Sequence, residues 1–179
     1  MFKFNFIRIA ALSVSFAFAS VLLSSCELLD DLEEDENPKL KAAYVVTIHE
    51  IIKYPRGLQI ELDIPTYAGG SKCVNNNYFI HSKNITSIVP IEIKDKPGFY
   101  DLDLHLDRRG RLLWTNLSMN FKGMNLAFVV DGVLYREFQP EMLSDDVDAV
   151  VRVKGPFDSA TALAMGKNSE NNYKIFNAK

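Results

Sequence analysis

The stretch LAFVVDGVLYREF, residues 126–138, decides the fold more than any other part of the chain. It holds two apolar runs joined by Asp131-Gly132. Asp-Gly is a strong signal for a two-residue β-hairpin, because both turn positions need a positive φ. We therefore predict two adjacent antiparallel strands here, with an antiparallel sheet around them.

A second strand is predicted upstream, where residues 99–107 alternate between apolar and polar side chains. An alternation of period two indicates a strand with one buried face and one solvated face. The apolar positions are Tyr100, Leu102, Leu104 and Leu106, and the polar positions are Asp101, Asp103, His105 and Asp107.

Residues 44–93 contain several short runs rich in β-branched side chains. Residues 44–52 and 58–64 flank Tyr54-Pro55-Arg56-Gly57, whose Pro and Gly are typical of a turn, so we predict that these runs pair as a hairpin. Glycine and asparagine in residues 69–77 predict a loop, and shorter strands are expected at 78–82 and 85–93.

Two helices complete the pattern. Apolar residues within 111–121 recur close to helical spacing, and a second helix is predicted to begin at Asp158, with Asp158 or Ser159 as its N-cap. A further strand is expected at 149–153. Together these elements predict an α+β domain with helices on one face of a mainly antiparallel sheet.

The N-terminus has the order of a secretory signal. Lys3 and Arg8 precede an uncharged run of 15 residues, 9–23, which is shorter than the roughly 20 residues of a membrane span. Leu23-Ser-Ser-Cys26 then resembles the lipobox of bacterial lipoproteins. The resemblance implies that residues 1–25 are removed and that Cys26 carries acyl chains such as palmitate. The alternatives are an ordinary signal peptide with an incidental cysteine and a buried apolar helix.

Residues 26–41 contain an acidic run with no basic residue before Lys39. Mutual repulsion and little apolar surface predict a solvated tether that holds a domain of residues 42–179 away from the membrane. The run also resembles the surface-export signal of Bacteroidetes-type lipoproteins, and composition supports both interpretations. We expect a location in the cell envelope, anchored by lipid to the outer membrane, facing the periplasm or the cell surface. The acidic residues are Glu27, Asp30, Asp31, Glu33, Glu34, Asp35 and Glu36.

Composition limits the classes of function. The 179 residues, 47% hydrophobic and 24% charged, are typical of one globular domain after a leader. Removal of Lys3 and Arg8 with the leader takes the formal charge from −3 to −5, which is the wrong sign for a nucleic-acid surface. We therefore expect no nucleic-acid partner.

Catalytic signatures are weak. The sequence has no phosphate-binding glycine loop, no G-x-S-x-G and no H-E-x-x-H, so we expect no enzyme activity, no cofactor and no metal site. The competing hypothesis is an envelope enzyme or a small-ligand or metal-binding protein. Its candidate residues are Asp103, His105 and the unpaired Cys73.

Residues 80–164 resemble the head subdomain in the first periplasmic loop of SecD. Three segments carry the resemblance: YDLDLHLD at 100–107 followed by Gly110 and Trp114, LAFVVDGVL at 126–134, and VRVKGPF at 151–157 before an alanine-rich helix. The resemblance implies a ferredoxin-like α+β head. The chain departs from the family at 136–140 and 142–148, where a binding edge is expected, and it lacks the transmembrane helices through which SecD moves proteins.

These observations favour a non-enzymatic, lipid-anchored envelope protein that binds a protein or peptide, with a link to protein export. Addition of a strand to an exposed sheet edge is one means of binding. The candidate binding residues are Leu134, Tyr135 and Phe138, which follow the predicted Asp131-Gly132 turn. A structural surface component is the remaining alternative.

Overall fold

The computed structural model describes residues 41–144 and 150–178. The predicted leader, the lipidation site Cys26 and the acidic run lie outside the described residues. The chain divides into two units, Met1–Lys41 and Ala42–Lys179, and the fold below is that of the second unit.

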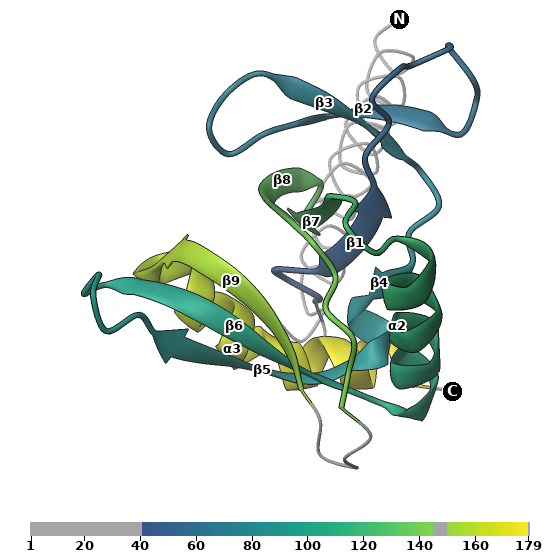
Figure 1. Ribbon diagram of the computed structural model, residues 1–179. Coiled ribbons are helices and arrows are strands. Elements are labelled where there is room, and N and C mark those ends of the chain that lie inside the picture. Colours follow the sequence, from purple (N-terminus) through teal and green to yellow (C-terminus); the bar gives the residue numbers. More distant parts are fainter. Residues whose placement is uncertain (1–40, 145–149, 179) are drawn as a thin grey trace, which may run out of the picture. The chain divides into compact units, whose positions relative to one another are not determined.

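The domain is α+β, and its strands form three antiparallel sheets (Figure 1). This confirms the predicted class, although the predicted single sheet is divided. One sheet has the order β4 (Ile80–His81), β1 (Val46–Glu50), β7 (Leu126–Val130), β8 (Val133–Phe138); the second pairs β2 (Glu61–Pro65) with β3 (Ser71–Asn75); the third has the order β5 (Ile85–Glu92), β6 (Phe99–Leu106), β9 (Val151–Asp158).

The two α-helices begin at aspartate caps. Helix α2 (Arg108–Asn120) starts three residues before the predicted helix, because the Asp107 carboxylate accepts the Gly110 N–H at 2.6 Å. Helix α3 (Ser159–Asn177) starts where predicted, with Asp158 accepting the Thr161 N–H at 2.9 Å. Helix α3 packs on the third sheet, mainly on β5, and a short 3₁₀ turn, η1 (Ser82–Asn84), leads into that strand.

The predicted hairpin at Asp131-Gly132 is confirmed. Strands β7 and β8 pair across it, and the two turn residues have φ values of 47° and 80°. The Asp131 carboxylate also accepts the backbone N–H groups of Tyr44 at 2.9 Å and Val45 at 2.8 Å. One aspartate therefore forms the turn and fixes the entry of the chain into β1.

Strand β6 also lies where the alternation places it, but its polar face is not simply solvated. Leu102 and Leu104 are fully buried as expected. On the other face, Asp103 is only 8% exposed and binds Arg152 of β9 through two hydrogen bonds of 2.7 and 2.6 Å. Asp101 accepts the Gly155 N–H at 2.7 Å, so these carboxylates hold β9 beside β6.

The predicted pairing of residues 44–52 with 58–64 is wrong. Strand β1 is central and pairs with β4 and β7, whereas β2 pairs with β3, which forms where a loop was expected. The turn between β2 and β3 is short and has positive φ at Gly69 and Gly70, so it closes a tighter hairpin than the longer connection before β2. The alternation of apolar and polar residues predicted where the strands lie, but not which strands pair with one another.

Strand β7 is buried along its whole length and supplies two separate cores. Its residues Leu126, Phe128 and Val130 face the main core, which also contains Trp114, Phe157 and Met165. Its residues Ala127 and Val129 face a second, smaller core. The other buried members of that second core are Ile64, Val74 and Leu134.

Gly155 of β9 is required by close backbone packing. A Cβ atom at this position would lie 2.1 Å from the backbone oxygen of Tyr100. We predict that Gly155→Ala lowers the free energy of unfolding by about 1–3 kcal/mol, as for other overpacked sites, measured by urea unfolding. In the control Gly166→Ala, the new methyl would meet the side chain of Pro90 at 3.0 Å and should cost less. Equal losses in the two variants would contradict this packing.

The fold disfavours the protonated form of two histidines. In His49, Nδ1 lies 2.8 Å from the Asn75 carbonyl oxygen and Nε2 lies 2.8 Å from the Thr47 hydroxyl. Burial lowers the pKa of His49, and the bond to Asn75 opposes this only in part. Burial, followed by the charges of Lys83 and His49, also lowers the pKa of His81, whose Nδ1 accepts the Lys83 N–H.

Because both pKa values lie below the ordinary 6.5, the unfolded chain takes up these protons first. The corresponding stability is present above pH 6.5 and is lost as the pH falls below 6.5, through the lower pKa values of the folded state. We predict that the free energy of unfolding in urea decreases from pH 7.5 to pH 5.5, and that His81→Gln reduces this decrease. A decrease of the same size in the variant would contradict the assignment.

Candidate functional site

The strongest candidate site is an apolar groove beside the β2–β3 hairpin, with a volume of about 370 Å³. Residues 50–61, which connect β1 to β2, form one wall, and the turn that follows α2 forms the other. We call it the hairpin groove. Its main lining side chains are Ile51, Tyr54, Leu58, Phe121, Met124 and Asn125.

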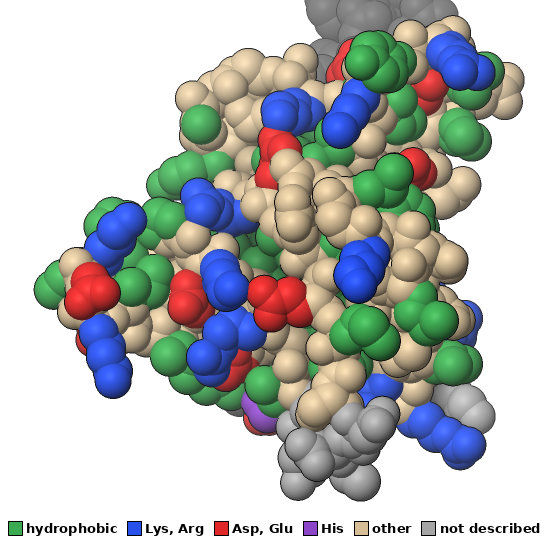
Figure 2. Space-filling view, in the orientation of Figure 1, with side chains coloured by type: hydrophobic (Ala, Val, Ile, Leu, Met, Phe, Trp, Pro, Cys, Tyr) green, Lys and Arg blue, Asp and Glu red, His purple; other side chains and the backbone are tan. Residues whose placement is uncertain are grey.

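The hairpin groove exposes large apolar side chains to solvent. Tyr54 is 84% exposed, Leu58 52% and Met124 57%, and Ile60 and Leu62 are exposed next to them in the chain. On the face drawn in Figure 2, hydrophobic side chains lie beside Lys and Arg over the β2–β3 region. Neighbouring exposed apolar groups of this kind indicate a binding surface, whereas isolated ones do not.

The wall of residues 56–58 is shaped by one carboxylate. Glu61 accepts the backbone N–H groups of Arg56 at 2.8 Å, Gly57 at 2.7 Å and Leu58 at 3.1 Å. Desolvation raises the pKa of Glu61, but the hydrogen bonds from Leu58, Arg56 and Gly57 together lower it below the ordinary value. The ionised side chain therefore holds the loop that carries Leu58.

The base of the hairpin is fixed to the rest of the domain through the second core. The backbone N–H of Ile52 donates to the Cys73 carbonyl at 2.9 Å, and Ile51 forms an antiparallel bridge with Val74. Ile64 and Val74 point into the second core against β7. The apolar contacts therefore set the position of both strands.

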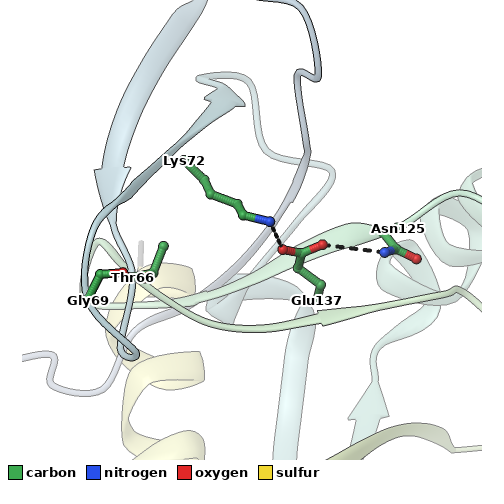
Figure 3. Close-up of polar contacts among 5 residues, drawn as sticks. All are labelled: Thr66, Gly69, Lys72, Asn125 and Glu137. Carbon is green, nitrogen blue, oxygen red and sulfur yellow. Dashed lines mark hydrogen bonds and ion pairs between the residues drawn. The ribbon is translucent and has the colours of Figure 1, made fainter.

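Polar contacts add to this attachment (Figure 3). Lys72 of β3 forms an ion pair with Glu137 of β8, and the other Glu137 oxygen accepts the Asn125 amide at 3.3 Å. In the turn, the Thr66 hydroxyl donates to the Gly69 carbonyl at 2.6 Å. Glu137 thus links the hairpin to Asn125, which lines the groove.

The structure places the candidate binding residues Leu134, Tyr135 and Phe138 in packed positions. Leu134 is 5% exposed in the second core, and its carbonyl accepts the Tyr67 N–H at 2.8 Å, so the β8 edge is already covered there. The Tyr135 ring stacks on Tyr67 with centroids 4.7 Å apart.

Phe138 is partly buried against the main core. Its ring lies parallel to Trp114 and edge-on to Phe128, with centroid distances of 6.1 and 6.5 Å. A charged substitution at Phe138 would therefore disturb the fold itself, and this residue cannot serve as a clean test of binding.

The candidate residues of the competing hypothesis are divided between two sheets, with Cys73 in one and Asp103 and His105 in another. Cys73 lies on β3, where desolvation, followed by the charges of Asp63 and Glu61, raises the pKa of its thiol and disfavours the nucleophilic thiolate. Asp103 is paired with Arg152, and His105 lies on β6. Within residues 41–144 and 150–178, no group of three or more His, Cys, Asp or Glu side chains is arranged to hold a metal ion.

No described helix has both the length and the apolar character needed to cross a membrane. No protein-family model matches the sequence, and a search of curated proteins finds no match.

Solved structures do show a likeness. The chain resembles SecDF in fold. One match is to a structure of SecDF described as a membrane component that enhances protein export, with a TM-score of 0.52 and 12% identity over 78% of this chain and 68% of that one. A second is to SecDF in its super-membrane-facing form, with the same score and identity, over 20% of that chain. The predicted SecD-like fold is confirmed, and at this identity the likeness concerns the fold alone.

The sequence interpretation missed the hairpin groove. Leu58, Ile60 and Leu62 alternate with polar residues, and the alternation predicts only a strand over residues 58–64. In the structure all three are exposed. The sequence does contain one signal of an exposed apolar surface. The segment next to the Pro-Arg-Gly turn has more apolar residues than a small hairpin can bury on its own.

We predict that Glu61→Gln loosens the wall of the groove. Loss of the carboxylate charge weakens the bonds from Arg56, Gly57 and Leu58, so the amide hydrogens of these residues should exchange faster with solvent at pH 7. Glu50→Gln, at the other acidic side chain of the groove, is the control and should leave their exchange unchanged. Unchanged exchange in Glu61→Gln would show that the loop is held by other contacts.

Proposed function

We propose that this protein is a lipid-anchored binding module of the cell envelope, linked to protein export, and that its hairpin groove binds extended apolar segments of polypeptides. The link to export rests on the SecDF-like fold, since SecDF is described as a component that enhances protein export. The anchor is the lipidated Cys26 that the sequence predicts, in the outer membrane.

The observation that carries the binding proposal is the exposed apolar lining of the groove. A folded segment would gain nothing by exposing Tyr54, Leu58 and Met124, whereas a binding site gains affinity from each apolar side chain that a partner covers. The main core is complete without them, since none of the three belongs to it.

The backbone of β2 favours recognition through side chains over strand addition. The backbones of Ile60 and Thr66 form hydrogen bonds with the β3 side of the hairpin. Because this pattern alternates along an antiparallel pair, the backbone N–H and C=O groups of residues 61, 63 and 65 point away from β3. Pro65 has no N–H, and the Glu61 N–H already donates to the Leu58 carbonyl at 2.9 Å. An added strand would find few donors there, so the apolar lining is the part that a partner can use.

The positive side chains at the rim define the partner further. Lys53 and Arg56 line the groove with Glu50 and Glu61, and the carboxylate of Glu61 is already engaged by backbone N–H groups. An apolar segment with polar or acidic flanks would meet two positive side chains here, against the one carboxylate of Glu50 that backbone N–H groups do not engage. Unfolded polypeptides awaiting or completing export present such segments.

Substitution of Leu58 tests the proposal. The probe is a fluorescently labelled, unstructured 20-residue peptide rich in Leu and Phe, titrated with the full-length protein. Leu58→Asp should weaken binding by about tenfold or more, because a buried leucine contributes about 1.5–3 kcal/mol.

The matched control is Leu112→Asp, at an exposed leucine of α2 outside the groove, which should bind as the wild type does. A peptide with Ser in place of Leu and Phe should not bind. Equal affinity of the two Asp variants, or no binding by the wild type, would refute the proposal.

A further inference from the structure

A second cleft, with a volume of about 280 Å³, lies between β8 and β9 and is charged instead of apolar. Strand β8 contributes Arg136 to it, and β9 contributes Arg152 and Lys154. Two acidic side chains, Glu137 and Glu141, also line it. In Figure 2, Lys and Arg side chains adjoin Asp and Glu in the middle of the face, over β9.

Two of the three cations already hold a carboxylate. Arg152 binds Asp103 through both of its oxygens, at 2.7 and 2.6 Å. The Lys154 ammonium lies 3.0 Å from a carboxylate oxygen of Glu141. The acidic neighbour of Arg136 in the sequence, Glu137, is engaged by Lys72. Among the described residues, Arg136 is therefore the cation of this cleft that lacks an acidic partner.

The guanidinium of Arg136 is held in place by one hydrogen bond, but not all of its N–H groups have an acceptor. Its Nη2 donates to the Gly155 carbonyl at 2.5 Å, which points the group toward β9. Its Nε is buried and has no hydrogen-bond partner within the part of the chain that the structure describes. A buried N–H without an acceptor costs free energy, and more so in a charged group. A guanidinium carries five N–H donors, and Arg136 lines the cleft, so a ligand there can bind the donors that the fold leaves free.

We propose that the cleft is a binding site for a carboxylate group, with Arg136 as its principal ligand and Lys154 as a second cation. A guanidinium and a carboxylate match in geometry, as Arg152 and Asp103 show beside the cleft. A phosphate dianion fits less well, because it concentrates two negative charges on one group in a space that Glu137 and Glu141 also line. The carboxylate comes from an acidic polypeptide or from a free small carboxylic acid.

The experiment follows the Arg136 side chain by NMR, through the Nε–Hε signal, in full-length protein. The probes are glutarate, an acetylated four-residue peptide containing two Glu, and the same peptide with Gln. We expect glutarate or the Glu peptide to shift this signal with saturation, and the Gln peptide not to do so. The tighter of the two binding probes identifies the source of the carboxylate.

Substitutions separate the site from the fold. Arg136→Met should abolish binding, and Lys154→Met, at an exposed side chain, should weaken it about threefold to tenfold while the protein stays folded. Inorganic phosphate is titrated in parallel. Saturable binding of phosphate without binding of either carboxylate would overturn the proposal. An Arg136 signal that no carboxylate shifts, or affinity unchanged in Lys154→Met, would also overturn it.

Discussion

The structure depends on the burial of β7 on both faces. Most strands of an antiparallel sheet bury one face and leave the other to solvent. In β7, Leu126, Phe128 and Val130 pack in the main core. Ala127 and Val129, on the other face, pack in the second core. The β2–β3 hairpin is too small to be stable alone, and the back of β7 gives it an apolar surface to cover. The hairpin groove exists because this second core holds the hairpin in place.

Carboxylates organise much of the remaining fold. Asp107 and Asp158 cap the two helices, Asp131 binds the backbone where the chain enters β1, and Asp101 binds that of β9. Glu61 binds the backbone N–H groups of residues 56–58, which form one wall of the hairpin groove. A charged acceptor forms stronger hydrogen bonds to backbone N–H groups than a neutral one does, so these few side chains fix loops that apolar packing does not reach. Arg136 is the contrasting case, a cation for which the described residues supply no carboxylate.

Local patterns in the sequence predicted those parts of the fold that depend on neighbouring residues. The Asp131-Gly132 hairpin, the strand of residues 99–106 and the cap at Asp158 are set by turn chemistry, alternation and capping, all of which act over a few positions. The partner of β1 and the division into three sheets are set by contacts between distant segments, which periodicity does not encode. The same limit applies to the site. Leu134 follows the predicted turn and is a candidate binding residue, but Tyr67 and the second core cover it. Leu58 lies in a predicted strand, and the alternation gives no sign that it lines an exposed groove.

The proposed function requires that the hairpin groove, and no other apolar surface of the domain, contacts an unfolded polypeptide. Site-specific photo-crosslinking tests it most directly. A benzophenone amino acid replaces Tyr54 in the groove in one sample and Leu163, an exposed residue of α3, in another. Each full-length protein is illuminated with a purified, unfolded secretory protein. Binding in the hairpin groove predicts a crosslinked product from position 54 and none from position 163. Products of equal yield from both positions, or a product from position 163 alone, would contradict it.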